Sequence, residues 1–261
     1  GSVHVVYILT PLESHCDFAQ RALRADKHVM VEKPVAASLE ELDSLRAIAQ
    51  ERRLHCIPGH NYVYEPQLER IRDMVQTGEL GKLAQVAIFY NIRHGPHVTR
   101  SLPGIVDQIM THHAYTCLFL TGERPEVVSC FTTEVDNDSL GRENLATAML
   151  RLPSGGLCLL QASFASDDHS NEPWSFYVKV LGTAGAARYS YNDSVVNHSH
   201  TIHSHTYVAF PRTVWRLTDH IVNQVLGHGE APLSGLDEAA AAFKILAACK
   251  ESARAGRHVA L

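Results

Sequence analysis

Apolar positions in the first sixty residues alternate between short continuous runs and helical spacing. Residues 3–10 and 28–31 are rich in valine, isoleucine, leucine and methionine, and proline or charged residues follow each run. Such runs are typical of buried parallel strands. Residues 14–24 form a helical stretch, and Ser38, followed three residues later by glutamate, opens a second helix with a capping box. With a third strand over residues 54–58, the pattern predicts the order β-α-β-α-β.

The chain changes character after residue 62. A helix, a strand and a second helix come first, then a run of longer strands, then two helices. The predicted helices span 66–77, 107–120, 213–226 and 236–255, and the predicted strands span 85–91, 126–134, 147–152, 157–165, 176–181 and 259–261. Helices combined with long antiparallel strands indicate an α+β arrangement. We therefore predict two domains, residues 1–61 and residues 62–261.

Lys33 stands where the predicted strand over residues 28–31 ends. Pro34 follows it and terminates the strand, because proline has no N–H to donate to the ladder. Open α/β sheets place their ligand crevices at this carboxyl edge, and a lysine there can have a lowered pKa and a chemical role. The alternative is a lysine whose alkyl stem lies along the sheet while its ammonium reaches water.

Composition narrows the classes of protein to consider. Of 261 residues, 45% are apolar and 20% are charged, and the net charge of −5 without a basic patch makes nucleic acid an unexpected partner. No apolar run approaches the ~20 residues of a membrane span. The six cysteines are widely spaced without a Cys-x-x-Cys pair, so we expect reduced thiols and a cytoplasmic protein.

Four short motifs occur around Lys33. They are Thr10-Pro11, Ser14-His15, the stretch from Lys27 to Pro34 that contains Glu-Lys-Pro, and the stretch from Pro58 to Tyr62. Together they resemble the Gfo/Idh/MocA oxidoreductases, although Asp26 stands where that family usually has glycine. The resemblance implies an α/β plus α+β fold: a partial Rossmann half-domain followed by a substrate domain with a large open, mostly antiparallel sheet. It also implies that Lys33 reaches both nicotinamide and substrate, and that the open sheet forms a dimer interface.

One expected part of that family pattern is missing from these residues. A complete member begins with a strand, a Gly-x-Gly-x-x-Gly turn and a helix that together hold the dinucleotide, and no such turn occurs in the 261 residues. The resemblance places the first strand here at the family's fourth strand. We therefore expect dinucleotide binding to be largely lost, and the first strand to have an unpaired edge that another chain or loop must cover.

The predicted helix over residues 107–120 carries the second candidate catalytic group. Family members have Asp-x-x-x-His on this helix, where the histidine acts as acid or base on the substrate hydroxyl and the aspartate orients it. Alignment on Thr121-Gly122 places His112 at the histidine position and Gln108 at the aspartate position. Asp107 is one residue away and would point about 100° around an α-helix. An amide can orient an imidazole but cannot stabilise an imidazolium as a carboxylate does.

Further polar residues are candidates for substrate or metal binding. His60 and Tyr62 follow the third strand, where Tyr62 could donate a proton, fix a substrate hydroxyl, or only form a contact between domains. The other candidate substrate-binding residues are His94, His113 and His169. Histidines 198, 200, 203 and 205 form a dense run in which strand alternation would pair neighbours on one face, so a divalent metal is possible, as is a solvated loop.

These expectations lead to three hypotheses. The main one is a cofactor-independent, possibly metal-assisted acid–base enzyme, a lyase, isomerase or cyclase acting on a polar small molecule, with Lys33 as base or enolate stabiliser and His112 as proton carrier. The first alternative is an NAD(P)-dependent sugar or polyol oxidoreductase whose N-terminal half is missing or supplied by another chain. The second is a non-catalytic subunit that pairs with an intact homologue. As partners we expect a small-molecule substrate and a second copy of the chain, in a homodimer or higher homo-oligomer formed through the C-terminal sheet, without nucleic acid or membrane.

Overall fold

The computed structural model describes residues 3–93, 98, 102–135, 141–165, 175–191, 193–198, 201–206 and 211–261, with the backbone alone for 193–195, 198 and 201–206. The chain forms two compact units. Unit 1 comprises Gly1–Glu65 and Pro211–Phe243, and unit 2 comprises Pro66–Phe210 and Lys244–Leu261. Each unit is described by itself. This division differs from the predicted one in that the segment Pro211–Phe243 joins unit 1.

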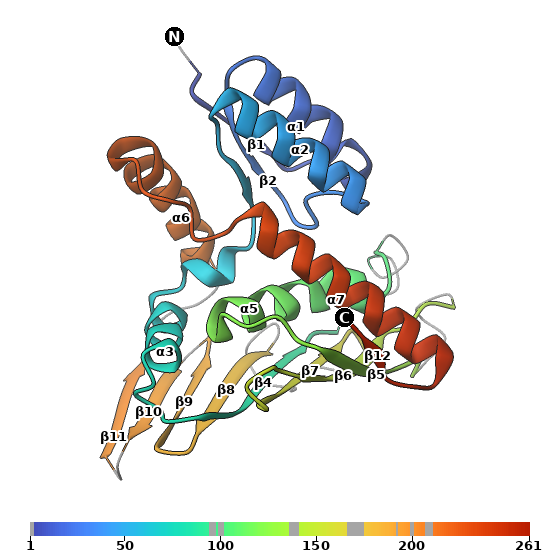
Figure 1. Ribbon diagram of the computed structural model, residues 1–261, viewed down its shortest axis with the longest axis vertical. Helices are drawn as coiled ribbons and strands as arrows, with labels where there is room; N and C mark the ends of the chain where they lie inside the picture. Colours follow the sequence, from blue (N-terminus) through green and yellow to red (C-terminus); the bar gives the residue numbers. More distant parts are fainter. Residues whose placement is uncertain are drawn as a thin grey trace. The chain divides into compact units, whose positions relative to one another are not determined.

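Unit 1 is built on a parallel sheet of three strands in the order β1-β2-β3 (Figure 1). Its elements are β1 (Val5–Ile8), η1 (Leu12–Ser14), α1 (His15–Arg24), β2 (His28–Val31), α2 (Leu39–Arg52), β3 (Cys56–Pro58) and η2 (Asn61–Tyr64). Tyr7 pairs with Met30, and Met30 pairs with Ile57, so the carboxyl ends of the three strands meet at one edge. The predicted β-α-β-α-β order is confirmed.

Local sequence explains where the helices of unit 1 begin and how they pack. The hydroxyl of Ser38 accepts a hydrogen bond from the Glu41 N–H at 3.2 Å, and the Glu41 carboxylate accepts one from the Ala37 N–H at 2.8 Å. These bonds satisfy two backbone donors at the start of α2, as the predicted capping box requires. Gln20 on α1 donates to the Ser44 hydroxyl on α2 at 2.8 Å, so the two helices lie side by side.

The C-terminal segment of unit 1 adds helices to the loop that follows β3. Its elements are α6 (Pro211–Asp219), the π-helix η5 (His220–Gly227) and the first two turns of α7 (Leu236–Ala255). Asn61 of η2 donates to the buried Thr213 hydroxyl at 2.6 Å, and the Tyr64 hydroxyl bonds the Ser234 hydroxyl at 2.8 Å. Contacts between residues 150 or more positions apart therefore fix η2 against this segment.

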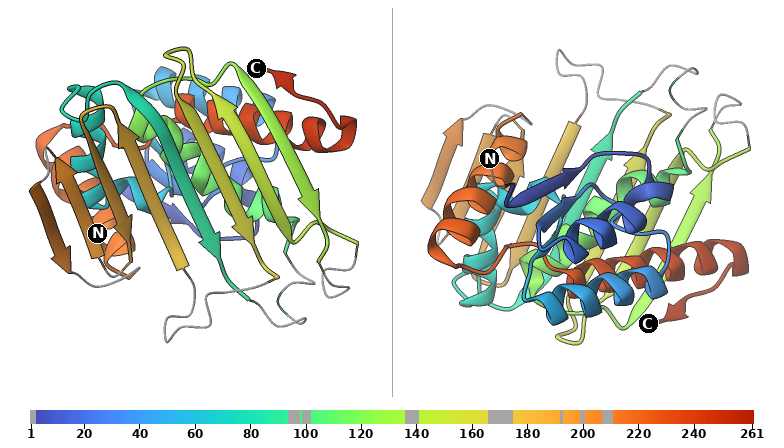
Figure 2. Two further views of the ribbon diagram at one scale, coloured as in Figure 1. Left: turned by 90° about the horizontal axis from the view of Figure 1, so that it is seen from below. Right: turned by 90° about the horizontal axis from the view of Figure 1, so that it is seen from above.

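Unit 2 contains a sheet of nine strands with helices on one face (Figures 1 and 2). Its elements are α3 (Pro66–Gln76), β4 (Leu83–Asn91), the π-helix η3 (Val106–Met110), α5 (Thr111–Thr121), β5 (Val127–Thr133), β6 (Leu145–Arg151), β7 (Leu157–Ser163), β8 (Ser175–Gly182), β9 (Gly185–Ser190), β10 (Asp193–His198), β11 (Thr201–Thr206), the remainder of α7 and β12 (Val259–Ala260). The order is β11-β10-β9-β8-β4-β7-β6-β5-β12, and only the β4–β7 pair is parallel. The predicted large, mostly antiparallel sheet is confirmed.

The two faces of this sheet differ in burial. Along β6, Ala146, Ala148 and Leu150 are fully buried, whereas Met149 and Arg151 between and beyond them are exposed. This alternation is the period-two pattern of a sheet with one covered face. Figure 2 shows α3 and α5 along the covered side and the opposite face as a broad array of strands.

Two features of the fold differ from the sequence prediction. Strands β9, β10 and β11 were not predicted, and the two helices over residues 107–120 and 213–226 both contain a π-helical turn. A π-turn takes one residue more than an α-turn, so it changes which residues share a face. Within the described residues, no helix is both long enough and apolar enough to cross a membrane.

Candidate active site

Lys33 follows β2 at the carboxyl edge of the parallel sheet of unit 1, as the sequence predicted. The residue keeps part of its surface accessible. Burial of its ammonium lowers the pKa of Lys33, and the neighbouring Glu32 carboxylate opposes part of that shift. A lysine with a lowered pKa releases its proton more readily, so this side chain suits acid–base chemistry.

Glu32 and Gly59 lie where the carboxyl ends of β2 and β3 pack closely against each other. Burial raises the pKa of Glu32, while Lys33 and His15 lower it through their charges. A Cβ on Gly59 would lie 3.1 Å from the Glu32 Oε2 atom and 3.1 Å from the Val31 carbonyl oxygen. A side chain at this position would force these neighbours to move by a few tenths of an ångström, so glycine suits the close approach of β3 to β2, where the Gly59 N–H donates to the Val31 carbonyl at 2.7 Å.

His60 lies directly after this glycine and is 3% exposed. Burial, reinforced by the charge of Lys33, lowers the pKa of His60 to about 3. The ring is therefore neutral at pH 7, and it can accept a hydrogen bond at one nitrogen and donate one at the other. Lys33 and His60 were both predicted as site residues, and unit 1 brings them into electrostatic contact.

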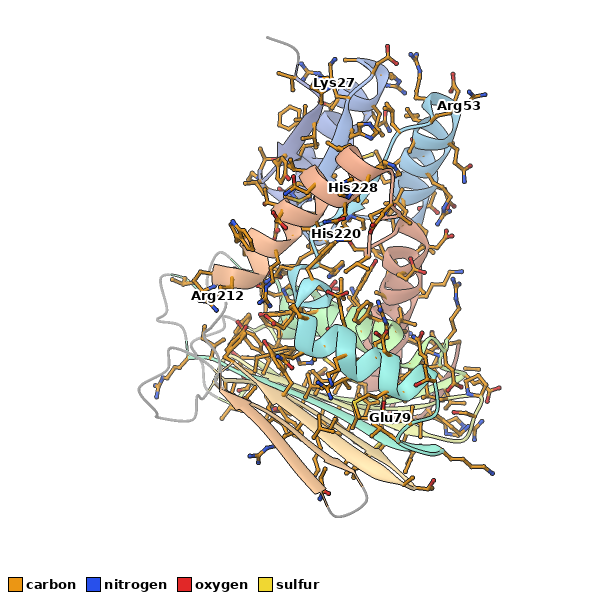
Figure 3. The ribbon with its side chains drawn as sticks, turned by 90° about the vertical axis from the view of Figure 1, so that its left-hand side faces the viewer. Lys27, Arg53, Glu79, Arg212, His220 and His228 are labelled. Atoms are coloured by element: carbon orange, nitrogen blue, oxygen red, sulfur yellow. The ribbon has the colours of Figure 1, made fainter. Side chains whose placement is uncertain are left out.

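Tyr62 is buried in η2 with 2% of its surface exposed. Its neighbours along η2 bond to the C-terminal segment of unit 1, and the Tyr64 ring meets the His220 ring edge-on at 5.2 Å. Figure 3 shows His220 on the helix that carries it. The predicted role of Tyr62 in substrate binding stays a prediction.

His15 is a further residue at this site, and the sequence prediction missed its role. It opens α1, is 2% exposed, and its two ring nitrogens lie 2.8 Å from the Pro34 carbonyl oxygen and 2.6 Å from the Thr10 carbonyl oxygen. His15 thus ties the loop after β1 to the segment that carries Lys33. The spacing from Thr10-Pro11 to Ser14-His15 was the only available signal, because backbone carbonyl partners leave no trace in a sequence.

The helix of unit 2 that carries the predicted catalytic pair begins with η3. Gln108 lies within this π-helix, and His112 lies in the first turn of α5 and is 8% exposed. The offset of about 100° predicted for Asp107 assumed a regular α-helix, and the π-turn removes that assumption. The Asp107 carboxylate instead accepts hydrogen bonds from the Lys250 ammonium on α7 at 2.8 and 3.1 Å.

His113 is fully buried in the core of unit 2, next to the rings of Tyr90 and Phe176. The centroid distances are 6.4 Å to Tyr90 and 6.5 Å to Phe176. Among the described residues, neither ring nitrogen of His113 has a hydrogen-bond partner, and burial lowers its pKa to about 3. The imidazole is therefore a neutral group in an aromatic environment.

The remaining candidates fall partly outside the described residues. His94, His169 and His200 lie outside them, and so do the side chains of His198, His203 and His205. Of the histidine run, the structure places His198 at the end of β10, and His203 and His205 in β11. Within the part of the chain that the structure describes, no group of three or more histidine, cysteine, aspartate or glutamate side chains could hold a metal ion.

Comparison with known protein families identifies both parts of the chain. A family model described as "Oxidoreductase family, NAD-binding Rossmann fold" matches residues 1–60, and one described as "GFO/IDH/MocA C-terminal domain" matches residues 68–188. Both models belong to one family of oxidoreductases, and together they cover more than half of the chain.

Individual relatives agree with this result. UDP-N-acetylglucosamine 3-dehydrogenase of Acidithiobacillus ferrooxidans is 30% identical over 62% of this chain and 49% of that protein. Inositol 2-dehydrogenase of Rhizobium meliloti is 23% identical over 71% of this chain and 57% of that protein. An oxidoreductase from Agrobacterium radiobacter, solved with NAD+, L-tartaric acid and magnesium, has the same fold with a TM-score of 0.86 at 17% identity, covering 100% of this chain and 80% of that one.

These comparisons correct the predicted activity and cofactor. A cofactor-independent lyase, isomerase or cyclase is contradicted, because the two curated relatives named above are dehydrogenases and residues 1–60 match an NAD-binding model. The matches span between 18% and 57% of the curated relatives' length. The prediction was wrong because it rested on the absence of a glycine-rich turn from a sequence that spans only part of its relatives.

Proposed function

Because this chain belongs to the Gfo/Idh/MocA family, we propose that it forms part of an NAD(P)-dependent oxidoreductase acting on a small polar molecule with a hydroxyl or carbonyl group, such as a sugar or polyol. The observation that supports this most is the lowered pKa of Lys33 at the carboxyl edge of the parallel sheet. That edge is where open α/β sheets bind their ligands.

The fit to a nicotinamide cofactor can be judged from the residues of unit 1. Lys33 and the neutral His60 offer polar atoms at the sheet edge and suit the polar end of such a ligand. The 261 residues contain no Gly-x-Gly-x-x-Gly turn of the kind that cradles a pyrophosphate. We therefore propose that this chain contacts the nicotinamide end of the cofactor. Whether it also contacts the pyrophosphate is tested by the binding measurement described below. When bound, a nicotinamide supplies the hydride acceptor or donor.

In this proposal, Lys33 and His112 handle the proton of the substrate hydroxyl. The Lys33 ammonium donates a hydrogen bond to the reacting oxygen, and its lowered pKa lets it exchange that proton. His112 accepts or returns a proton, and Gln108 orients its ring through an amide hydrogen bond. We further propose that His60, Tyr62, His94 and His169 contribute to substrate binding. The role predicted for His113 in substrate binding stays a prediction, because its ring is enclosed in the core of unit 2.

We also propose that the protein is a homo-oligomer formed through the open face of the unit 2 sheet. Apolar side chains are exposed on that face: Phe131 by 76%, Met149 by 37% and Leu157 by 40%. They come from the neighbouring strands β5, β6 and β7, so a second copy could bury them together. Sedimentation of the protein and of a Phe131→Lys variant tests this, because a monomeric wild-type protein would contradict it.

The predicted location in the cytoplasm is part of the same proposal. All six cysteines are free thiols, including Cys117 and Cys158, whose sulfur atoms lie 3.2 Å apart without a disulfide. Free thiols at this distance suit a reducing compartment.

Calorimetric titration with NAD(H) and NADP(H) tests the proposed activity. The proposal expects binding to the 261-residue chain, with reduction of NAD(P)+ in a panel of sugars, inositols and diols followed at the nicotinamide absorbance band. Lys27→Met is a suitable control protein, because Lys27 precedes β2 and lies away from its carboxyl end. Absence of binding up to millimolar concentration would contradict nucleotide recognition by this chain.

A further inference from the structure

The feature that carries a further inference is the pair of carbonyl groups around His15. Nδ1 lies 2.8 Å from the Pro34 carbonyl oxygen, and Nε2 lies 2.6 Å from the Thr10 carbonyl oxygen. The distance to Pro34 is within the ordinary range of N–H···O hydrogen bonds, the distance to Thr10 is slightly shorter than that range, and the ring is 2% exposed. Little room is left for water to take the place of either partner.

The chemistry of the partners fixes what the ring must do. A backbone carbonyl oxygen can only accept hydrogen bonds, whereas a neutral imidazole has one N–H and one bare nitrogen. A neutral His15 would therefore place a nitrogen lone pair against an oxygen lone pair at one end of the ring. Only the imidazolium form donates at both ends, and a donor with charge makes the stronger hydrogen bond.

His28 in the same unit shows the opposite arrangement. Its Nδ1 accepts a hydrogen bond from the backbone N–H of His55 at 3.0 Å, so that nitrogen carries no proton. The two rings stack with centroids 5.2 Å apart, and burial together with the charges of His55 and His4 lowers the pKa of His28. A donor partner thus identifies a neutral histidine, and two acceptor partners identify a charged one.

We propose that His15 is a doubly donating imidazolium that acts as a positioning residue for Lys33. It joins Thr10, at the end of β1, to Pro34, the residue that follows Lys33, and so fixes the backbone from which the lysine side chain extends. Its charge adds to that of Lys33 beside the Glu32 carboxylate.

The charged groups around His15 agree with this protonation state. From the β2 side, Glu32 interacts electrostatically with both His15 and Lys33. The acidic residues near the start of α1 are Glu13, which precedes the helix, and Asp17, which lies in its first turn. Both are exposed. Glu32, which is only partly buried, is therefore the acidic group whose charge favours the imidazolium form of His15.

The first test reads the ring directly and does not depend on the proposed function. In a ¹⁵N-labelled wild-type protein at neutral pH, both nitrogens of His15 should show the chemical shift of a protonated nitrogen. His28 serves as the internal reference, because its Nδ1 should show the shift of a bare nitrogen. Assignment comes from loss of the His15 signals in His15→Gln, or from contacts of its ring protons with Thr10 and Pro34. One bare nitrogen on His15 would overturn the proposal.

The second test measures positioning of Lys33 and rests on the proposed oxidoreductase activity. A His15→Gln variant keeps one donor and should lower kcat by about 10- to 100-fold with little change in KM, because a misplaced catalytic group slows the reaction step. Ser38→Ala is the matched control for lost stability, because Ser38 ends the same segment between β2 and α2 but its hydroxyl bonds the Glu41 N–H at the start of α2 rather than the backbone of Lys33 or Pro34. Equal kcat values in both variants would contradict positioning, even if the ring proves to be charged.

Discussion

The two units bury their polar groups in different ways. Unit 1 buries charges with partners: Glu32 lies beside Lys33, and the almost fully buried Glu65 carboxylate accepts a hydrogen bond from Arg216. Unit 2 buries His113 among aromatic rings, and the described residues give its nitrogens no partner. A charged group with a partner can gain or lose a proton during a reaction. A neutral ring whose buried nitrogens have no hydrogen-bond partner mainly lowers the free energy of unfolding.

His60 and His113 make the comparison within one residue type. The pKa of each is lowered to about 3, but Lys33 contributes to the shift of His60, while burial alone accounts for that of His113. Similar values therefore have different meanings. The lowered pKa of His60 reflects its electrostatic interaction with Lys33 at the end of a strand. The lowered pKa of His113 reflects only its burial in the core of unit 2.

The largest effect is expected where the charge takes part in chemistry. Lys33→Met should lower the oxidoreductase rate by about 100- to 1,000-fold, because it removes a donor aimed at the reacting oxygen. The folded structure should persist, since methionine fills similar space. Turnover and thermal unfolding of this variant should be compared with Lys27→Met; Figure 3 shows Lys27 at the end of unit 1 that also carries Arg53. Equal turnover in the two variants would remove Lys33 from the mechanism.

Breaking the second buried pair of unit 1 should affect stability instead. Arg216→Ala should lower the free energy of unfolding by about 3 kcal/mol, because it leaves the Glu65 carboxylate, with 3% of its side chain exposed, without its counter-ion. Arg21→Ala is the control, since Arg21 and Asp17 are 69% and 68% exposed and their pair should contribute less than about 0.5 kcal/mol. Urea unfolding distinguishes the two, and equal losses would show that burial does not strengthen the pair.

The corresponding substitution in unit 2 should have the opposite sign. His113→Phe should raise the free energy of unfolding by about 1–3 kcal/mol, because it removes two buried polar atoms next to Tyr90 and Phe176. His113→Ala should lower it by leaving a cavity. A loss of stability in the phenylalanine variant would show that the imidazole gains a partner from a ligand or another part of the chain.

The last prediction concerns pH. The folded pKa of His113 is about 3, below its ordinary value of 6.5, so the unfolded chain binds more protons between these limits. Stability should therefore fall as pH drops from about 6.5 towards 3, by up to about 1.4 kcal/mol per unit for this group. Urea midpoints at several pH values should show a shallower fall in His113→Phe than in the wild type. His60 has the same sign and should keep part of the slope.

Helices and strands with strong patterns could be predicted from the sequence. The helix predicted over residues 236–255 coincides with α7, and Ser38 caps α2 as expected. Strands β9 to β11 were missed because residues 185–206 are rich in serine and histidine and lack a continuous apolar run. The π-turn of η3 was missed because the helix is buried on all sides from residue 109 to residue 121, so it has no one-sided apolar stripe whose shift could reveal the additional residue.

A site residue could be predicted only where a reactive residue type stands next to a recognisable secondary-structure signal in the sequence. Lys33 could be found because a strand signal ends in a charged residue and a proline. The role of His15 could not be predicted, because its hydrogen-bond partners are the backbone carbonyl groups of Thr10 and Pro34, and every residue has such a group. The membership of Pro211–Phe243 in unit 1 could not be found either, since it depends on contacts between distant residues such as Asn61 and Thr213.

The split composition of unit 1 has a consequence for synthesis on the ribosome. The segment Gly1–Glu65 leaves the ribosome before the strands of unit 2, but it needs Pro211–Phe243, which is translated only after those strands. At ordinary translation rates this delay is on the order of ten seconds. During that time the nascent chain must hold Tyr64 without its partner Ser234, while unit 2 has nearly all of its sheet available. The segment of unit 1 that is made before unit 2 can therefore be completed only after the sheet of unit 2 has been made.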